Sequence, residues 1–196
     1  MHSDDSRSQP LILIRHGEST WNESGTVQGQ ADGATLTENG RLQVRKTAES
    51  FRGAAFDEII SSDLQRAVET AQIIADVVGL TVTTTSALRE RSFGVFEGRP
   101  LADLGPELSG ILDGKVVDTS AHPEGGESLD AFYHRVRSYM EILRGREDRP
   151  RMILVTHGGT IRVIRAYGAG TVMQDSLWYP VMNASLWTVT LDGRNH

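Results

Sequence analysis

The sequence contains no cysteine. This absence excludes disulfide bonds, thiolate zinc sites, iron–sulfur clusters and cysteine nucleophiles, so covalent catalysis would have to use another side chain. The chain also lacks long hydrophobic runs, because the apolar stretches at residues 11–14 and 152–155 are far shorter than the ~18 residues that span a bilayer. The first ten residues are polar, with no apolar stretch typical of a secretory signal. We therefore expect a cytoplasmic protein.

Positive charge is scarce as well. The 20 lysines and arginines are outnumbered by 26 aspartates and glutamates, which gives a net charge of -6. Surfaces that bind nucleic acid or anionic membranes need a clustered excess of basic residues, so we expect neither as a partner, although a small basic pocket is compatible with this charge. The length of 196 residues favours a single domain over residues 10–196, preceded by a disordered segment at residues 1–9.

Short apolar runs alternate with helical patterns along the chain, and Thr37 is typical of a helix N-cap. We expect strands at residues 11–14, 56–61, 81–85 and 152–156, helices at residues 38–52, 63–78, 128–143 and 160–167, and an antiparallel edge strand at residues 183–191. This alternation predicts an α/β fold, a three-layer α/β/α sandwich with a mostly parallel central sheet. Residues 94–127, rich in Gly and Pro, indicate an elaborated connection in which substrate choice is determined.

The most unusual polar groups follow two of the predicted strands. The sequence RHGE occupies residues 15–18, and THGG occupies residues 156–159. Ligands of open α/β sheets bind beyond the carboxyl ends of the strands, so His16 and His157 are expected to face one crevice. The glycines beside them allow a ligand to approach the backbone closely. The pattern therefore predicts a ligand pocket at this end of the sheet.

Three further features favour a phosphoryl group as the ligand. Arg15 carries a planar fork of donors that matches phosphate oxygens. Residues 19–22 are expected to present backbone N–H groups from a short helical turn. Arg66, one turn into the helix predicted at residues 63–78, adds a second permanent charge if its side chain returns to the crevice.

Each of these residues also has an ordinary structural interpretation. Most histidines are not catalytic, and Arg66 considered alone would lie on a solvated helix face. Glu90, in the sequence LRER, is as compatible with a surface ion pair as with proton transfer. His134 is expected to be structural, and His122, in a Gly-rich loop, either borders the substrate or has no contact with it. The position of RHGE directly after a buried strand argues against chance for His16.

Six segments match, in order, the motifs of one known family. They are RHGESTWN (residues 15–22), QGQAD (28–32), LTENG (36–40), SSDLQRAVETA (61–71), LRERSFGVFEG (88–98) and VTHGG (155–159). Together they resemble the histidine phosphatase superfamily, in its phosphoglycerate-mutase-like branch. The match runs from residue 11 to residue 159, so it is far more specific than RHGE alone.

The resemblance implies a role for each matching residue. His16 would be the nucleophile that becomes phosphohistidine, Glu90 the proton donor, and the phosphate pocket would consist of Arg15, Asn22, Arg66 and His157. The weaker substrate-binding candidates are Gln28, Gly29 and Gly158; the last stands where the acid-phosphatase branch has aspartate. We expect no metal and no cofactor, because the arginines and His157 would neutralise the charge of the phosphoryl group in flight.

The same pocket serves phosphatases and mutases, and the acceptor of the phosphoryl group distinguishes them. Mutases of the family carry a pair of arginines after the Glu-bearing segment, whereas residues 98–126 here contain only Arg99 and Lys115 as permanent cations. This favours a metal-independent phosphomonoesterase that acts on a small phosphorylated metabolite. The alternatives are a cofactor-dependent phosphoglycerate mutase and a non-catalytic module that binds a phospho-ligand. The sequence leaves a homodimer open.

Overall fold

The centre of the fold is a twisted five-stranded sheet. It is seen in a computed structural model that describes residues 10–105, 122–171 and 179–191. The strands are β1 (Leu11–Arg15), β2 (Glu58–Ser62), β3 (Val82–Thr85), β4 (Met152–Thr156) and β5 (Leu186–Val189). Their order across the sheet is β3-β2-β4-β1-β5, with β5 antiparallel to β1 and all other neighbours parallel.

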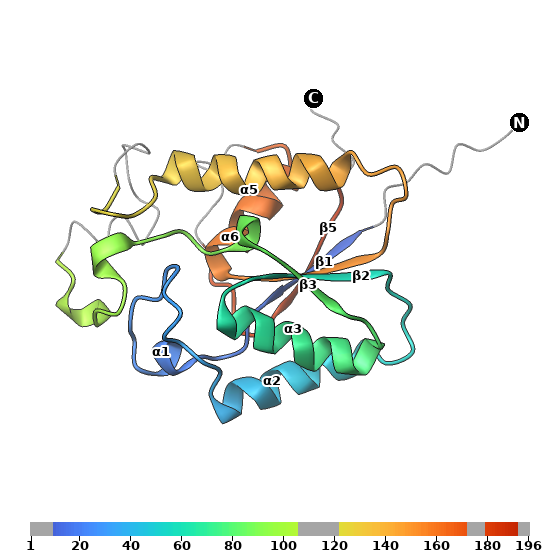
Figure 1. Ribbon diagram of the computed structural model, residues 1–196, viewed down its shortest axis with the longest axis horizontal. Coiled ribbons are helices and arrows are strands. Elements are labelled where there is room, and N and C mark those ends of the chain that lie inside the picture. The colour runs from blue at the N-terminus through green and yellow to red at the C-terminus, as the bar shows by residue number, and fades with distance from the viewer. Residues whose placement is uncertain (1–9, 106–121, 172–178, 192–196) are drawn as a thin grey trace, which may run out of the picture.

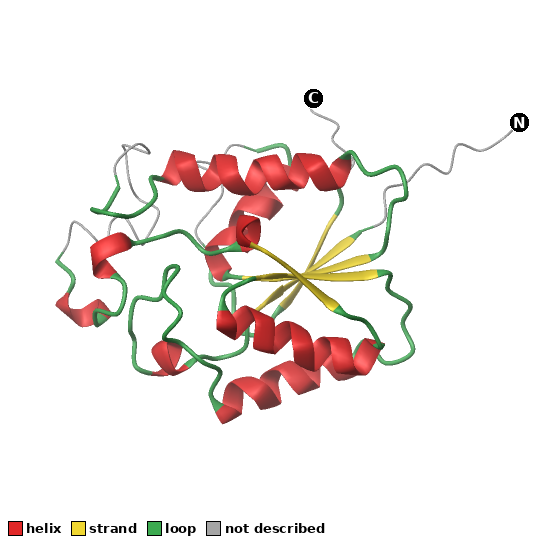
Figure 2. Cartoon of the chain, in the orientation of Figure 1, coloured by secondary structure: helices red, strands yellow, loops and turns green. Residues whose placement is uncertain are grey.

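Helices cover both faces of the sheet (Figures 1 and 2). α2 (Glu38–Glu49) and α3 (Gln65–Val78) lie on one face, and α5 (Leu129–Arg144) and α6 (Gly158–Gly168) lie on the other. Successive side chains of the central strand β4 point to opposite faces of the sheet. Leu154 therefore packs in one hydrophobic cluster and Val155 in the other. The three-layer α/β/α sandwich with a mostly parallel sheet is therefore confirmed.

Local signals decide where several helices begin and end. Thr37, predicted as an N-cap, accepts the backbone N–H of Gly40 at 2.9 Å, and Ser128 accepts that of Ala131 at 3.0 Å. Gly79 ends α3 with a φ of 74°, a left-handed conformation that glycine adopts at little cost. These caps fix the helices that pack against the sheet.

The start of α3 differs from the prediction. The helix begins at Gln65 rather than at residue 63, because Leu64 is extended and acts as the N-cap. Asp63 instead accepts two hydrogen bonds from Arg89, at 2.6 and 2.7 Å. Arg66 is consequently the second residue of α3 and not a full turn into it.

Other boundaries also shift. β2 begins two residues later than predicted, and α6 begins at Gly158 rather than at residue 160. The edge strand predicted at residues 183–191 is shorter, because Ala184 has a φ of 54° and breaks the extended backbone before β5. Its antiparallel pairing with β1 is confirmed.

The connection predicted at residues 94–127 begins with two 3-10 turns, Gly94–Phe96 and Leu101–Asp103. Residues 106–121, which include Lys115, lie outside the described residues, as does the predicted disordered segment at residues 1–9. Among the helices of the described ranges, none has the length and hydropathy needed to cross a membrane.

Candidate active site

Two histidines occupy the carboxyl ends of adjacent parallel strands. His16 follows β1 and His157 follows β4, and the last residues of these strands, Arg15 and Thr156, are paired in the sheet. The two imidazole centroids are 5.2 Å apart, and only 3% of His16 and 1% of His157 is exposed. The structure therefore brings both histidines to one buried point, as predicted.

The backbone fixes the protonation of His16. Its Nδ1 lies 2.7 Å from the carbonyl oxygen of Gly17, and because a carbonyl oxygen can only accept, Nδ1 carries the ring proton. Burial, followed by the charges of Arg66 and Arg15, lowers the pKa of His16 well below its ordinary value. The ring is thus neutral at neutral pH, and Nε2 keeps a lone pair that can attack an electrophile.

Two arginines bring permanent charge to the same place. Arg66 is 1% exposed and donates to the carbonyl oxygens of Gly29 at 2.7 Å and Ala31 at 3.1 Å, while Arg15 donates to the carbonyl oxygen of Val181. Burial lowers the pKa of Arg66 to about 10 and lowers that of Arg15 as well. Both side chains remain charged at neutral pH, so the buried site holds two fixed cations.

The second histidine is held by a serine that the sequence analysis did not single out. Nε2 of His157 lies 2.8 Å from Oγ of Ser62, the last residue of β2. Burial, followed by the positive charges of Arg66 and Arg15, lowers the pKa of His157 well below its ordinary value. This ring, too, is neutral at neutral pH.

Three buried nitrogens of the site are unpaired. Nε of Arg15, Nε of Arg66 and Nδ1 of His157 have no hydrogen-bond partner among the described residues. Buried polar atoms are nearly always paired, so three unpaired nitrogens at one point indicate a place where an anion completes the contacts. The two fixed cations match the double negative charge of a phosphate monoester. Within the same residue ranges, no cluster of three or more His, Asp or Glu side chains is arranged to hold a metal ion.

Asn22 belongs to the short helix α1 (Thr20–Glu23) and is joined to the backbone of His16 through Asn183. Its Oδ1 accepts hydrogen bonds from the Ser19 backbone at 3.1 Å, from the Ser19 hydroxyl at 3.0 Å and from Nδ2 of Asn183 at 3.1 Å. Asn183, which also donates to the His16 carbonyl oxygen, was missed because it lies 161 residues away in sequence. With Oδ1 occupied, the amide NH₂ of Asn22 is the group left to bind a ligand.

The expectation that residues 19–22 present their backbone N–H groups to an anion is wrong for three of the four residues. The Ser19 N–H bonds to Asn22 Oδ1, the Thr20 N–H to the Thr35 carbonyl oxygen, and the Asn22 N–H to Ser19. The cap of α1 accounts for two of these donors, because Ser19 and Asn22 form a reciprocal capping box, and the carbonyl oxygen of Thr35 accepts the third.

Glu90 reaches the site from the segment after the 3-10 turn Ser86–Leu88. One carboxyl oxygen accepts the Arg91 backbone N–H at 3.0 Å, and the other accepts the Gly159 backbone N–H at 2.9 Å. The negative charge of Glu90 raises the pKa values of Arg15 and Arg66, whereas burial lowers them. The carboxyl group of Glu90 is thus held at the first turn of α6, by the N–H of the residue two positions after His157.

The family model described as "Histidine phosphatase superfamily (branch 1)" matches residues 11–196. The chain belongs to the histidine phosphatase superfamily.

Similar proteins within this superfamily carry mixed names. The Arabidopsis thaliana protein named "Phosphoglycerate mutase-like protein 4" is 36% identical over 165 residues, which cover 82% of this chain and 71% of that protein. Among solved structures, a mycobacterial glucosyl-3-phosphoglycerate phosphatase bound to VO3 has a TM-score of 0.81 and 30% identity, over 92% of both chains. A phosphoglycerate mutase from Thermus thermophilus has a TM-score of 0.68 and 33% identity, also over 92% of both chains.

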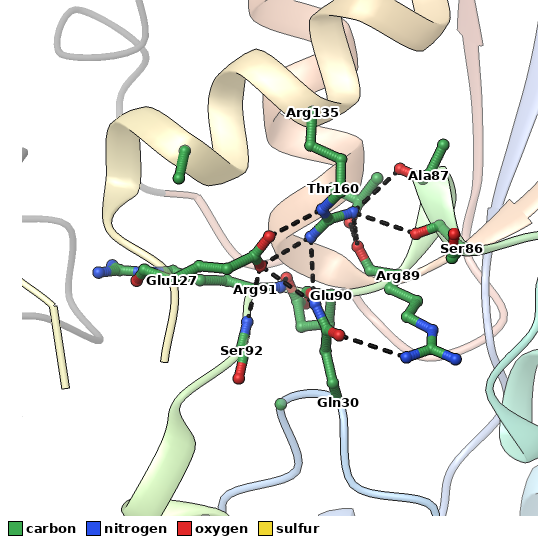
Figure 3. A network of polar contacts seen from close by, with 12 residues as sticks. Gln30, Ser86, Ala87, Arg89, Glu90, Arg91, Ser92, Glu127, Arg135 and Thr160 are labelled. Carbon is green, nitrogen blue, oxygen red and sulfur yellow. Dashed lines mark hydrogen bonds and ion pairs between the residues drawn. The ribbon is translucent and has the colours of Figure 1, made fainter. Parts of the chain in front are cut away.

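In this histidine phosphatase, a polar network supports the segment that carries Glu90 (Figure 3). Arg135 of α5 donates to both carboxyl oxygens of Glu127 at 2.8 Å and to the carbonyl oxygens of Arg89 at 3.0 Å and Glu90 at 3.1 Å. Glu127 in turn accepts the backbone N–H of Ser92 at 2.9 Å. Arg135 and Glu127 were missed, because their roles depend on contacts across the fold.

The weaker substrate-binding candidates contact residues of the candidate site or of its surroundings. Oε1 of Gln28 lies 2.9 Å from the Ser19 hydroxyl, whose one proton it shares with Asn22, and Gly29, with a φ of 49°, presents its carbonyl oxygen to Arg66. A Cβ on Gly29 would lie 2.1 Å from Oε1 of Glu97, so only glycine fits there. Gly158 packs beside the Arg15 side chain.

The two further histidines of the described ranges, His122 and His134, lie on the surface. His122 is exposed, and its Nδ1 is 3.1 Å from the Pro123 carbonyl oxygen. His134 is exposed on α5 beside Tyr133.

Proposed function

We propose that this histidine phosphatase is a phosphomonoesterase that hydrolyses a small phosphorylated metabolite through a phosphohistidine at His16, without a metal or a cofactor. The observation that carries the proposal is the pairing of a neutral, oriented His16 with unpaired buried nitrogens on Arg15, Arg66 and His157. These groups combine a nucleophile with donors for the oxygens of a phosphoryl group.

The first half-reaction transfers the phosphoryl group to the enzyme. The lone pair on Nε2 of His16 attacks phosphorus, and the bond between phosphorus and the ester oxygen breaks. Arg15, Arg66 and the Nδ1–H of His157 stabilise the charge on the equatorial oxygens. Glu90, protonated at this stage, gives its proton to the departing alkoxide.

The second half-reaction returns the enzyme to its starting state. Glu90, now a carboxylate, takes a proton from a water molecule whose oxygen attacks phosphorus. The bond between phosphorus and Nε2 breaks, inorganic phosphate leaves, and the lone pair of His16 is restored. One carboxyl group thus serves as acid and then as base.

Water, rather than a second substrate, is the proposed acceptor. A mutase must hold its substrate carboxylate with cationic side chains while the bisphosphate reorients. Residues 98–126 contain two permanent cations. Arg99 is exposed, with its Cζ 5.7 Å from the centre of the Phe96 ring, and Lys115 is outside the described residues. The mycobacterial relative named as a phosphatase, solved with VO3, supports hydrolysis. The relatives named as a mutase or as mutase-like keep phosphoglycerate mutase as the second candidate.

The acceptor is decided by two assays on the same phosphoglycerate, with the bisphosphate activator present. We expect phosphate release to exceed mutase turnover by at least about tenfold, equivalent to about 1.4 kcal/mol in barrier height. A panel of phosphomonoesters, assayed with and without excess chelator, then identifies the best substrate and is expected to show activity that survives chelation. Mutase turnover tenfold above hydrolysis would establish the second candidate, and loss of activity with chelator would refute the metal-independent mechanism.

Gly159→Ala is expected to displace Glu90. A Cβ at residue 159 would lie 2.2 Å from Glu90 Oε1, whereas a Cβ at residue 158 would lie 3.7 Å from Arg15 Nε, an ordinary contact. A general acid displaced by an ångström costs about 10²-fold in rate, so we expect a loss of that order for an alkyl phosphate. Gly158→Ala is the matched control, with a far smaller expected loss. Equal losses in the two variants, measured as kcat, would show that the position of Glu90 is not the cause.

A further inference from the structure

Ser62 links β2 to the phosphate pocket. It is the last residue of β2, it is fully buried, and its Oγ lies 2.8 Å from Nε2 of His157. β2 and β4 are parallel neighbours, so their carboxyl ends bring Ser62 next to the residue that follows β4. The same Oγ accepts the backbone N–H of Leu64 at 3.3 Å.

We propose that Ser62 is a positioning residue: its hydroxyl donates to Nε2 of His157 and so fixes the ring proton on Nδ1, where it faces the phosphoryl group. This inference rests on the proposed function, because the Nδ1–H acts there as a donor to the phosphoryl oxygens.

The hydrogen bonds around Oγ distinguish the two tautomers of His157. If Nε2 carried the proton, Oγ would accept two bonds, from His157 and from Leu64, and the hydroxyl proton would have no acceptor within the described residues. If Ser62 donates to Nε2, the hydroxyl accepts one bond and donates one. A buried donor without an acceptor is costly, so the second arrangement is favoured.

The unpaired Nδ1 of His157 gives a second, independent reason to place the ring proton on Nδ1. Nδ1 of His157 is buried and has no partner in the part of the chain that the structure describes. The ring is neutral, because burial and the charges of Arg66, Arg15 and Arg135 disfavour a second proton. A lone pair on Nδ1 would repel phosphoryl oxygens, whereas an Nδ1–H binds them.

The two histidines consequently hold a proton on the same atom for opposite purposes. In His16, the Gly17 carbonyl oxygen holds the Nδ1 proton away from the ligand, and Nε2 is left as the nucleophile. In His157, Ser62 occupies Nε2, and the Nδ1 proton is left for the ligand. One ring supplies an electron pair and the other a hydrogen bond, although both are neutral.

The tautomer is measured directly on ¹⁵N-histidine-labelled protein by long-range ¹H–¹⁵N correlation spectra, with the His157 signals assigned by their absence from His157→Asn. We expect a protonated Nδ1 and an unprotonated Nε2 in the wild type. In Ser62→Ala we expect the Nε2–H form to become populated. Phosphate release should fall about tenfold to a hundredfold, as when the outer partner of a functional histidine is removed. Ser62→Thr, which keeps the hydroxyl, should restore the wild-type tautomer.

Ser61→Ala is the matched control. Ser61 is a fully buried neighbour on the same strand, but its hydroxyl donates to the Ser62 carbonyl oxygen at 2.8 Å and not to a histidine. It should keep the Nδ1–H tautomer. A protonated Nε2 in the wild type, or an unchanged tautomer in Ser62→Ala, would overturn the role of Ser62 even if phosphate is released. A Ser62-dependent tautomer in a protein that hydrolyses no ester would instead overturn the proposed function and leave the effect of Ser62 on His157 standing.

Discussion

His16→Ala is expected to lower phosphate release by at least about 10⁴-fold, because removal of a nucleophile eliminates the covalent step rather than weakening it. The other pocket residues cannot replace it: the arginines hold their protons at neutral pH, and Nε2 of His157 is occupied by Ser62. The fold should be retained, because alanine brings no polar side-chain atom into the buried site, and the Gly17 carbonyl oxygen is the one group that loses its bond to Nδ1. Steady-state phosphate release and a thermal unfolding curve measure both effects.

His134→Ala is the control for this variant. It removes the same side chain from an exposed position on α5, so activity should stay close to that of the wild type. If His16→Ala kept more than about a hundredth of the wild-type rate, a loss of less than about 2.7 kcal/mol in transition-state stabilisation, the covalent mechanism would be wrong.

Glu90→Gln is expected to slow the enzyme by about 10²- to 10⁴-fold on an alkyl phosphate, the usual contribution of a general acid. The loss should be much smaller on a nitrophenyl phosphate, because an acidic leaving group departs without protonation. The comparison of the two substrates separates chemistry from structure: glutamine also places an NH₂ group against the N–H of Arg91 or Gly159, which affects both substrates.

Glu97→Gln provides the control for the loss of a carboxylate charge from the same segment. Oε1 of Glu97 accepts the N–H groups of Gln30 and Phe93 at 2.9 and 2.8 Å, which glutamine can still accept. We expect the ratio of the two substrate rates to stay at the wild-type value in this variant. An equal loss for alkyl and nitrophenyl esters in Glu90→Gln would contradict the assignment of Glu90 as the general acid.

The parts of the fold that the sequence predicts well are those with local causes. β4 follows from five consecutive buried residues, and the N-terminus of α2 follows from the hydroxyl of Thr37. The shifted start of α3 shows the limit of such signals. Asp63 is a good helix-capping residue by type, but the distant Arg89 binds its carboxylate, and the helix begins after Leu64 instead.

The candidate site shows the same difference between features with local causes and features that depend on distant residues. Strand ends and the RHGE motif place His16 and His157 together, because parallel strands share one edge for their carboxyl termini. Ser62 and Asn183 carry no such signal. Ser62 acts through a hydrogen bond to His157, 95 positions away, and Asn183 acts through bonds to Asn22 and His16, 161 and 167 positions away. The failed expectation for the N–H groups of residues 19–22 has a local cause for Ser19 and Asn22, which bond to each other, and a longer-range cause for Thr20, which bonds to Thr35.

The most direct test of the account is to trap the phosphorylated enzyme. Wild-type protein and His16→Ala are mixed with a labelled phosphomonoester, quenched within the first turnover, and digested for mass spectrometry. The account predicts label on His16 of the wild type, stable in alkali and labile in acid, and no label in the variant. Label on a serine or threonine, or equal labelling of His16→Ala, would contradict a phosphohistidine at His16.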